Sequence, residues 1–441
     1  MEKKRLMEVM AQYHQQTDDN IVGVTFGRKR KGGILTSDRA IVFTVKQKLP
    51  QSQLQESQML PKVIRIDNEN VLTDVVQGEP RLATVSDCIP AFYDWRSTPP
   101  TNRDTFRPLE CGIAIGNWDN QGTKYAEDEY GVGGWYAMKY FVGTLGLFAK
   151  DNETDSLVGI TNAHVAIYDP FLCSERVAYP GGNANQVNNV KNDRISQPNT
   201  TVSGDTYSIG RVKRYYPLRG NGIYNYTDAA VIAMENSSDI SQLTSWHQHG
   251  LTPPAYYPWA TEAEIDDLMT YNPWDLDVQL YSSGRTTGAK GEGATKLRIN
   301  SWGLITIPYN KQGNYVNILQ TDVIEIVATL YATGGWLDTC YDPIVAGDSG
   351  SALIADIGGV KKVIGLIFGN VVETATGKAL SGLACRIDNL ATLLNVSEWD
   401  GSTLSYSDTA ATQEITVNGL DNRVYIDSGG KRYWQVGLRN I

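Results

Sequence analysis

The stretch Gly347-Asp348-Ser349-Gly350-Ser351 constrains this chain more than any other feature of its sequence. Glycines on either side of a serine let the backbone turn sharply and let a second chain approach without meeting a side chain. Such a turn can direct the main-chain amides of Gly347 and Ser349 towards one point, where they would stabilise negative charge developing on an oxygen atom. The stretch therefore predicts a serine nucleophile beside an oxyanion hole.

A serine hydroxyl becomes nucleophilic at neutral pH only when a neighbouring base accepts its proton. Among the four histidines, His14 falls in a predicted helix where a solvated position is expected, and His247 and His249 lie near prolines in a predicted surface connection. His164 instead follows the apolar run at 157–160, which predicts a buried strand that carries the imidazole at its end. We expect His164 to be the base; the alternative is a buried histidine with a structural role.

An acid that orients this histidine should follow a polar loop and precede a buried strand. Asp228 fits that description, since it opens the apolar run at 229–233, where an unpaired carboxylate is costly. The alternative is a turn residue with a solvated side chain. The chain order His164, Asp228, Ser349 favours the first interpretation, because chymotrypsin-type triads follow this order and subtilisin-like enzymes and α/β-hydrolases do not.

Several motifs, in this order, resemble those of the trypsin-like (chymotrypsin-fold) serine peptidases, over about residues 115 to 398. They are Gly143-Thr144-Leu145-Gly146, Thr161-Asn162-Ala163-His164, Asp228-Ala229-Ala230-Val231, Gly284-Arg285-Thr286-Thr287-Gly288 and Gly347 to Ser351. The resemblance implies a mainly β chain in which two six-stranded β-barrels hold the triad in the cleft between them. It identifies His164, Asp228 and Ser349 as catalytic.

The sequence also predicts how the chain divides into domains. We expect a small N-terminal α/β domain, a joining segment, a peptidase domain of two barrels, and a C-terminal β appendage; their residues are 1–85, 86–134, 135–398 (barrels at about 135–245 and 275–398) and 399–441. The N-terminal arrangement is similar to regions attached to some prokaryotic or phage peptidases of this family. Self-cleavage, if it occurs, is expected at 86–110 or 400–412, and an inserted loop at 183–201.

The tripeptide Ile21-Val22-Gly23 resembles the terminus that activates secreted trypsin-like enzymes when cleavage frees its amine. Asn20 precedes it, however, and His164 follows 143 residues later, so we interpret it as a strand. Asp348 should then find a partner other than a new terminus.

Composition narrows the chemistry and the setting. The odd count of five cysteines, without a CxxC pair, favours neither a disulfide framework nor a zinc site, and we expect no cofactor and no metal. A net charge of −10 disfavours nucleic acid as a partner. No apolar signal core and no run of eighteen apolar residues is present, so we expect no membrane partner and a cytoplasmic location, or one within a virion.

The resemblance implies which residues line the primary specificity pocket. Its base would be Pro343 and Ile344, whereas a one-residue shift would bring in Asp342 and basic specificity. Its wall and the strand that pairs with substrate would come from the stretch Gly365-Leu366-Ile367-Phe368-Gly369-Asn370. Bulky apolar walls predict a small or apolar residue before the scissile bond.

Two functions follow. The first is a serine endopeptidase with a polypeptide substrate, acting through an acyl-enzyme at Ser349 with an oxyanion hole made by the amides of Gly347 and Ser349. The second is a structural or binding protein, for example a component of an assembled particle or homo-oligomer, that keeps the fold and is inactive or processes only itself.

Overall fold

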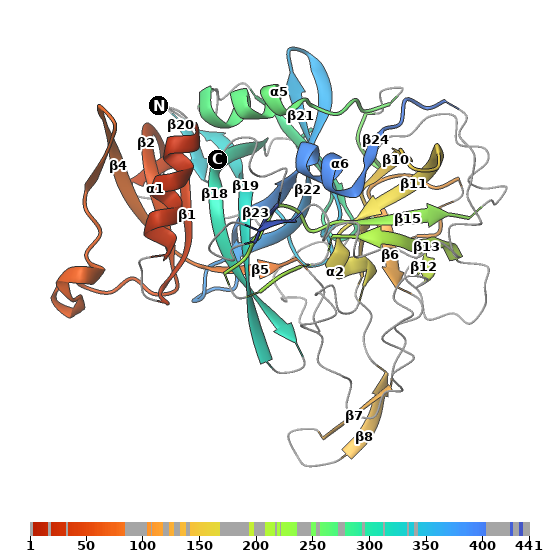
Figure 1. Cartoon of the computed structure of the whole chain (residues 1–441), viewed down its shortest axis with the longest axis horizontal. Helices are drawn as coiled ribbons and strands as arrows, with labels where there is room; N and C mark the ends of the chain where they lie inside the picture. The colour runs from red at the N-terminus through yellow and green to blue at the C-terminus, as the bar shows by residue number, and fades with distance from the viewer. Residues whose placement is uncertain are drawn as a thin grey trace.

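The structure is a computed structural model, and it describes most of the chain (Figure 1). The described residues are 3–15, 19–31, 34–83, 104–106, 108–117, 123–127, 133–137, 142–167, 194–197, 208–216, 218–220, 222–235, 248–252, 256–271, 278–292, 296–311, 314–332, 335–338, 343–402, 424–426 and 432–434. The predicted loop at 183–201 and the predicted self-cleavage segments therefore lie almost entirely outside the described residues, as do His247, Asp342 and three cysteines, Cys88, Cys173 and Cys340.

The first barrel closes through strand pairing. Its strands are β6 (Ile113–Asn117), β9 (Val142–Leu145), β10 (Leu147–Asp151), β11 (Ser156–Thr161), β12 (Arg194–Ser196), β13 (Ser208–Tyr215) and β15 (Ala230–Met234). They pair in the order β10-β11-β15-β13-β12-β6-β9, and only Gly146 separates β9 from β10. Counting β9 and β10 as one interrupted strand, the described strands form a six-membered ring. Every residue of β11 and β15 is buried, as their apolar sequences require.

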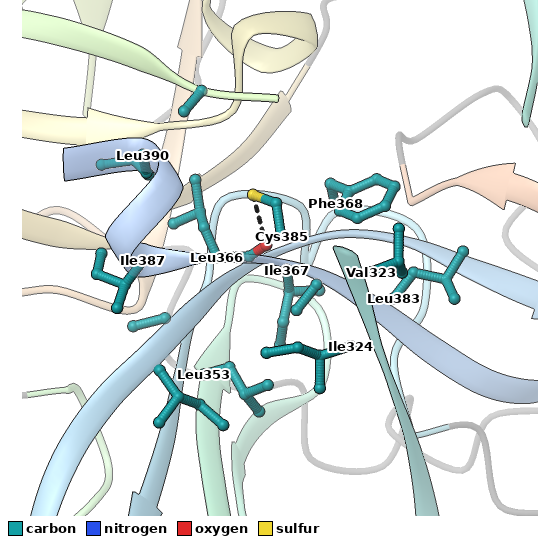
Figure 2. Close-up of a cluster of buried hydrophobic side chains, with 14 of the residues drawn as sticks. Val323, Ile324, Leu353, Leu366, Ile367, Phe368, Leu383, Cys385, Ile387 and Leu390 are labelled. Carbon is teal, nitrogen blue, oxygen red and sulfur yellow. Dashed lines mark hydrogen bonds between the residues drawn. The ribbon is translucent and has the colours of Figure 1, made fainter. Parts of the chain in front are cut away.

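The second barrel closes in the same way. Its strands are β16 (Leu280–Gly284), β18 (Lys296–Lys311), β19 (Asn314–Ala332), β21 (Ala352–Ile357), β22 (Val360–Val372) and β23 (Ala379–Arg386). They pair in the order β18-β16-β21-β22-β23-β19, and β18 also pairs with β19, which completes a ring of six. Figure 2 shows part of the buried hydrophobic cluster around this barrel, in which Ile367 and Ile324 lie on one side of β22 and Leu366 on the other. The chain is thus mainly β, with the expected pair of barrels.

The N-terminal α/β unit lies against the second barrel (Figure 1, left). It contains α1 (Lys3–Gln15), β1 (Ile21–Lys31), β2 (Ile34–Val45), two short 3₁₀ turns (Gln51–Gln53 and Glu56–Gln58), β3 (Val63–Ile66), β4 (Glu69–Gln77) and β5 (Glu79–Leu82). The 23–27 segment of β1 pairs antiparallel with 301–305 of β18. The tripeptide Ile21-Val22-Gly23 is therefore strand. The predicted domain boundaries stay a prediction; the structure adds that the N-terminal unit shares a sheet with the second barrel.

Shorter elements complete the described chain. They are β7 (Thr123–Glu127), β8 (Gly133–Ala137), α2 (Ala163–Ala166), β14 (Tyr224–Asn225), α5 (Glu262–Asp266) with the π turn Asp267–Tyr271, β17 (Gly288–Lys290), β20 (Gly335–Asp338), α6 (Ile387–Leu394), β24 (Val396–Glu398), β25 (Val424–Ile426) and β26 (Arg432–Trp434). In the predicted C-terminal appendage, β25 pairs antiparallel with β26. None of the helices in the described ranges is long and apolar enough to cross a membrane.

A buried ionic cluster fastens α6 to the first barrel. Asp151, at the end of β10, is fully buried and accepts hydrogen bonds from Arg214 at 2.8 and 3.2 Å, and it also contacts Lys213. Arg214 Nε donates at 2.6 Å to the carbonyl oxygen of Leu394, the last residue of α6. Burial by itself would raise the pKa of Asp151, but the hydrogen bonds and positive charges of Arg214 and Lys213 lower it to about 2.

We predict that Asp151→Asn lowers the free energy of unfolding by about 3–5 kcal/mol at pH 7, because it leaves two cations buried without their carboxylate. The pKa of Asp151 in the folded protein lies below its ordinary value of 3.8, so this stabilisation is present above about pH 4 and is lost as pH falls towards 2. Urea unfolding at pH 7 and pH 3 measures it, and the difference between variant and wild type should shrink at pH 3. Asp155→Asn is the control, since Asp155 is 79% exposed in the same hairpin.

Candidate active site

His164 and Asp228 form a buried pair at the rim of the first barrel. The strand β11 ends at Thr161, and the short helix α2 then carries His164. The imidazole Nδ1 contacts Asp228 Oδ2, and the main-chain amide of His164 donates to Oδ1 at 3.2 Å. Asn162 Nδ2 donates to the main-chain oxygen of Asp228 at 2.6 Å. Both side chains are 0% exposed. Because the carboxylate binds the Nδ1 edge of the ring, it fixes the orientation of the imidazole and leaves Nε2 for another partner.

The loop that carries Ser349 is shaped by Asp348. One carboxylate oxygen of Asp348 accepts hydrogen bonds from the amides of Thr286 and Thr287, at 2.9 and 3.0 Å, and the other accepts from the amide of Val345 at 3.1 Å. A Cβ atom on Gly284 would lie 2.4 Å from the same carboxylate, which explains the glycine there. Asp348 is thus held by main-chain donors, and the expectation that it needs no new terminus agrees with these contacts.

The first barrel also holds this loop. The amide of Thr144, in β9, donates to the main-chain oxygen of Ser349 at 2.8 Å, and the Thr144 hydroxyl donates to the oxygen of Gly347 at 3.0 Å. Gly347 and Gly350 have positive φ angles of 99° and 93°, which a residue with a side chain rarely adopts. A Cβ atom on Gly146 would lie 1.9 Å from the oxygen of Gly350, so the two barrels approach here as closely as backbones can.

Ser349 itself is fully buried, and its hydroxyl is not bonded to the histidine. Ser349 Oγ donates at 3.2 Å to the main-chain oxygen of Phe368. Within the described residues, His164 Nε2 is buried without a hydrogen-bond partner. The structure therefore brings His164 to Asp228 and places Ser349 on the loop that Asp348 shapes, while the hydrogen bond from serine to histidine is not made.

A segment of the N-terminal unit lies along the strand beside Ser349. Residues of β5 pair antiparallel with β22, with Leu82 opposite Gly369 and Arg81 opposite Asn370. Figure 1 shows β5 reaching from the N-terminal unit to the middle of the molecule. The next residue, Ala83, donates from its amide to the oxygen of Phe368 at 3.0 Å, and its own oxygen accepts from the amide of Gly347 at 2.6 Å. The amide predicted to form an oxyanion hole therefore already binds a carbonyl group.

The residues before the serine loop, whose Gly347 amide binds Ala83, are buried. Pro343 is buried, and Ile344 is 1% exposed. A Cβ atom on Gly382 of β23 would lie 2.4 Å from Ile344 Cγ1, and Asn370 Nδ2, on β22, donates to the oxygen of Ile344 at 3.1 Å. Ala83 itself is 0% exposed, so a larger side chain there would have to displace the atoms that surround it.

Of the predicted residues Gly365 to Asn370, the last three contact the bound segment. Phe368 accepts the hydrogen bond from Ala83, and Gly369 and Asn370 pair with Leu82 and Arg81 of β5. Gly365 and Leu366 instead pair with Arg386 and Cys385 of β23, and Leu366 and Ile367 project from opposite faces of β22 (Figure 2). The pairing with β5 continues to Val372.

A buried thiol lies behind Asp228. Cys385 Sγ donates to the oxygen of Leu366 at 3.4 Å (dashed in Figure 2) and accepts from the Thr227 hydroxyl at 3.3 Å. Burial raises the pKa of Cys385 to about 11, which keeps the thiol protonated at neutral pH. Among the residues that the structure describes, Cys111 and Cys385 are free, and no group of three or more His, Cys, Asp and Glu side chains could hold a metal ion.

Sequence reasoning missed the bound segment and Gly382, whereas Asn370 lies in the stretch that we predicted to pair with substrate. A proline in a short extended stretch that ends in a small residue, as at 79–83, was the available signal. It could not identify the partner strand, which lies almost 300 residues further along the chain. Two other histidines that the structure describes have other partners: His14 contacts Thr306 Oγ1 at 3.0 Å, and His249 contacts Glu110 at 2.7 Å.

Comparison with solved structures finds bacterial proteases of the chymotrypsin fold. Thermobifida fusca Protease A is 12% identical, with 63% of this chain and 96% of that chain covered and a TM-score of 0.32. Cellulomonas bogoriensis chymotrypsin is 11% identical (58% and 90% covered, TM-score 0.31), and Nocardiopsis protease is 12% identical (66% and 97% covered, TM-score 0.34). No family model and no curated protein matches the sequence. The predicted likeness of the N-terminal unit to regions of prokaryotic peptidases gains no support from these matches.

We predict that Asp348→Ala lowers the free energy of unfolding by at least about 3 kcal/mol, because three main-chain N–H groups lose their buried acceptor. Urea unfolding at pH 7 measures the loss. Asp356→Ala is the matched control, since Asp356 accepts one exposed hydrogen bond, from the amide of Gly359, and should cost less than about 1 kcal/mol. Equal losses for the two variants would contradict the role given to Asp348.

Proposed function

We propose that this protein is a serine endopeptidase that cleaves peptide bonds through an acyl-enzyme at Ser349. The observation that supports it most is the peptide carbonyl of Ala83, held by the amide of Gly347 on the loop that also carries Ser349. A carbonyl group polarised by a main-chain donor next to a serine is the arrangement that acyl transfer requires. His164, with its ring held by Asp228 and its Nε2 buried and unpartnered among the described residues, supplies the base.

In this proposal Ser349 rotates from the oxygen of Phe368 to His164 Nε2. Ser349 Oγ attacks the carbonyl carbon, and His164 accepts the hydroxyl proton and later donates it to the leaving amine. Asp228 stabilises the imidazolium cation from the Nδ1 side. The amides of Gly347 and Ser349 together stabilise the oxyanion. Water then hydrolyses the acyl-enzyme with His164 again acting as the base.

The burial of Ala83, which is 0% exposed, supports a preference for alanine before the scissile bond. We assign Ile344 to the base of the pocket, where it packs near Gly382 and its main-chain oxygen accepts a hydrogen bond from Asn370. A leucine, phenylalanine or lysine side chain would have to displace buried groups. The alternative function, a structural or binding protein that keeps the fold without chemistry, has no comparable observation in its favour among the described residues.

We call the channel beside β22 that residues 79–83 fill the groove. We predict that peptide hydrolysis depends on all three proposed catalytic residues once residues 79–83 are displaced from the groove. Arg81→Pro should clear it, because a proline lacks the N–H of a residue paired with Asn370. In this background, Ser349→Ala, His164→Ala and Asp228→Asn should each lower kcat/KM for an alanine peptide by on the order of 10⁴-fold. Hydrolysis that survives Ser349→Ala would contradict the mechanism.

We further predict the substrate preference in the same background. A peptide anilide with alanine at the cleaved position should exceed its phenylalanine and lysine counterparts by on the order of 100-fold in kcat/KM. Ile344→Ala enlarges the pocket and should narrow the difference between alanine and leucine substrates. Val360→Ala, at the first residue of β22, which is 48% exposed, is the control and should leave the ranking unchanged. Faster cleavage after lysine would reject the assignment of the pocket.

A further inference from the structure

Residues 79–83 lie in the groove in the manner of a substrate. The amide of Ala83 donates to Phe368, and because hydrogen-bonded pairs alternate in an antiparallel ladder, Arg81 and Asn370 form the next such pair. Pro80, which has no N–H, then falls opposite Val371 at a position where none is needed. A Cβ atom on Gly369 would lie 2.6 Å from the oxygen of Arg81, so the strand is free of a side chain where the segment comes closest.

The carbonyl group of Ala83 is the one presented for attack. Its oxygen lies 2.6 Å from the Gly347 amide, and the Ser349 hydroxyl and the Ala83 amide both donate to the same oxygen atom, that of Phe368. The nucleophile and the amide of Ala83 therefore share one acceptor. Ala83 is also 0% exposed, and its methyl group is the smallest side chain of any chiral residue.

We propose that the peptide bond between Ala83 and Thr84 is cut by Ser349 of the same chain, and that residues 1–83 then stay bound and keep the groove filled. This inference rests on the proposed peptidase function. Ser349 Oγ bonds to the Ala83 carbonyl carbon as His164 takes the hydroxyl proton; the carbon–nitrogen bond breaks, and Thr84 leaves as an amine with that proton. Water then cleaves the ester, which restores Ser349 and leaves a carboxylate at Ala83.

Retention of the cleaved fragment follows from contacts that do not involve the cut bond. The strand β1 pairs with β18, and β5 pairs with β22. Lys3 forms an ion pair with Asp266 at 2.7 Å, and Met10 is fully buried in the core shared with the second barrel. Asp348 already has its three main-chain donors, so cleavage is not needed to shape the serine loop. The fragment regulates the site by occupying it.

Mass spectrometry of the full-length protein tests both parts. Under denaturing conditions the wild type should give two fragments, of 83 and 358 residues, which together account for the 441 residues of the chain. Native mass spectrometry should show the two fragments as one non-covalent complex. Ser349→Ala should remain intact. Ala83→Phe should be cut on the order of 100-fold more slowly, and Ala83→Ser should be cut as the wild type is. Val63→Phe, a matched change at a 42% exposed position of the N-terminal unit, should not alter cleavage.

Hydrolysis of the alanine peptide by the Arg81→Pro variant distinguishes a failure of the self-cleavage proposal from a failure of the proposed peptidase function. A wild type that stays intact, or is cut at another bond, while Arg81→Pro hydrolyses the peptide, would overturn self-cleavage and leave the peptidase function standing. If the wild type stays intact and Arg81→Pro is inactive, both proposals fail. Cleavage after Ala83 with fragments that separate under native conditions would overturn retention. Faster peptide hydrolysis by Arg81→Pro than by the cut wild type supports inhibition by the bound fragment.

Discussion

The buried carboxylate of Asp348 is the contact on which the site depends. It gathers amides from the hairpin after β16 and from the serine loop itself, and in doing so it fixes the loop whose Gly347 amide points at Ala83. A carboxylate that is 0% exposed is costly unless its hydrogen bonds are made. Because main-chain donors make them here, the loop takes its shape from the second barrel and needs no amine released by cleavage.

The other groups of the proposed site, His164 and Asp228, come from the first barrel. The two barrels approach each other closely at the loop that carries Ser349. Thr144 bonds to the main chain of Gly347 and Ser349, while the glycine at 146 allows the backbones to meet. The same barrel presents His164 with its Nδ1 edge bound to Asp228. This contact between the barrels tolerates little change in sequence, because backbone atoms rather than flexible side chains are in contact there.

The sequence predicted much of this arrangement because its informative residues are local. A strand that ends in His164, an aspartate that opens an apolar run, and glycines that flank Ser349 each follow from a few neighbouring residues. The two barrels were implied by the resemblance to trypsin-like peptidases that these motifs carry. The structure places His164 and Asp228 in contact, and their catalytic role stays a prediction.

What the sequence could not predict depends on pairing between distant segments. Nothing near Pro80 and Ala83 in the sequence indicates that they lie beside β22. Leu366 and Ile367, which we expected in the pocket wall, are buried on opposite faces of β22, whereas Gly369 and Asn370, from the same predicted stretch, pair with β5. Register between strands is set by tertiary packing, which local patterns do not encode.

The most direct measurement of the central claim is to treat Arg81→Pro with a fluorophosphonate and locate the adduct by tandem mass spectrometry. A single adduct on Ser349, absent after His164→Ala, is the result that we expect from a nucleophile activated by its neighbouring base. An adduct on another residue, or an Arg81→Pro protein that folds and remains unlabelled, would contradict the assignment of Ser349 as the nucleophile.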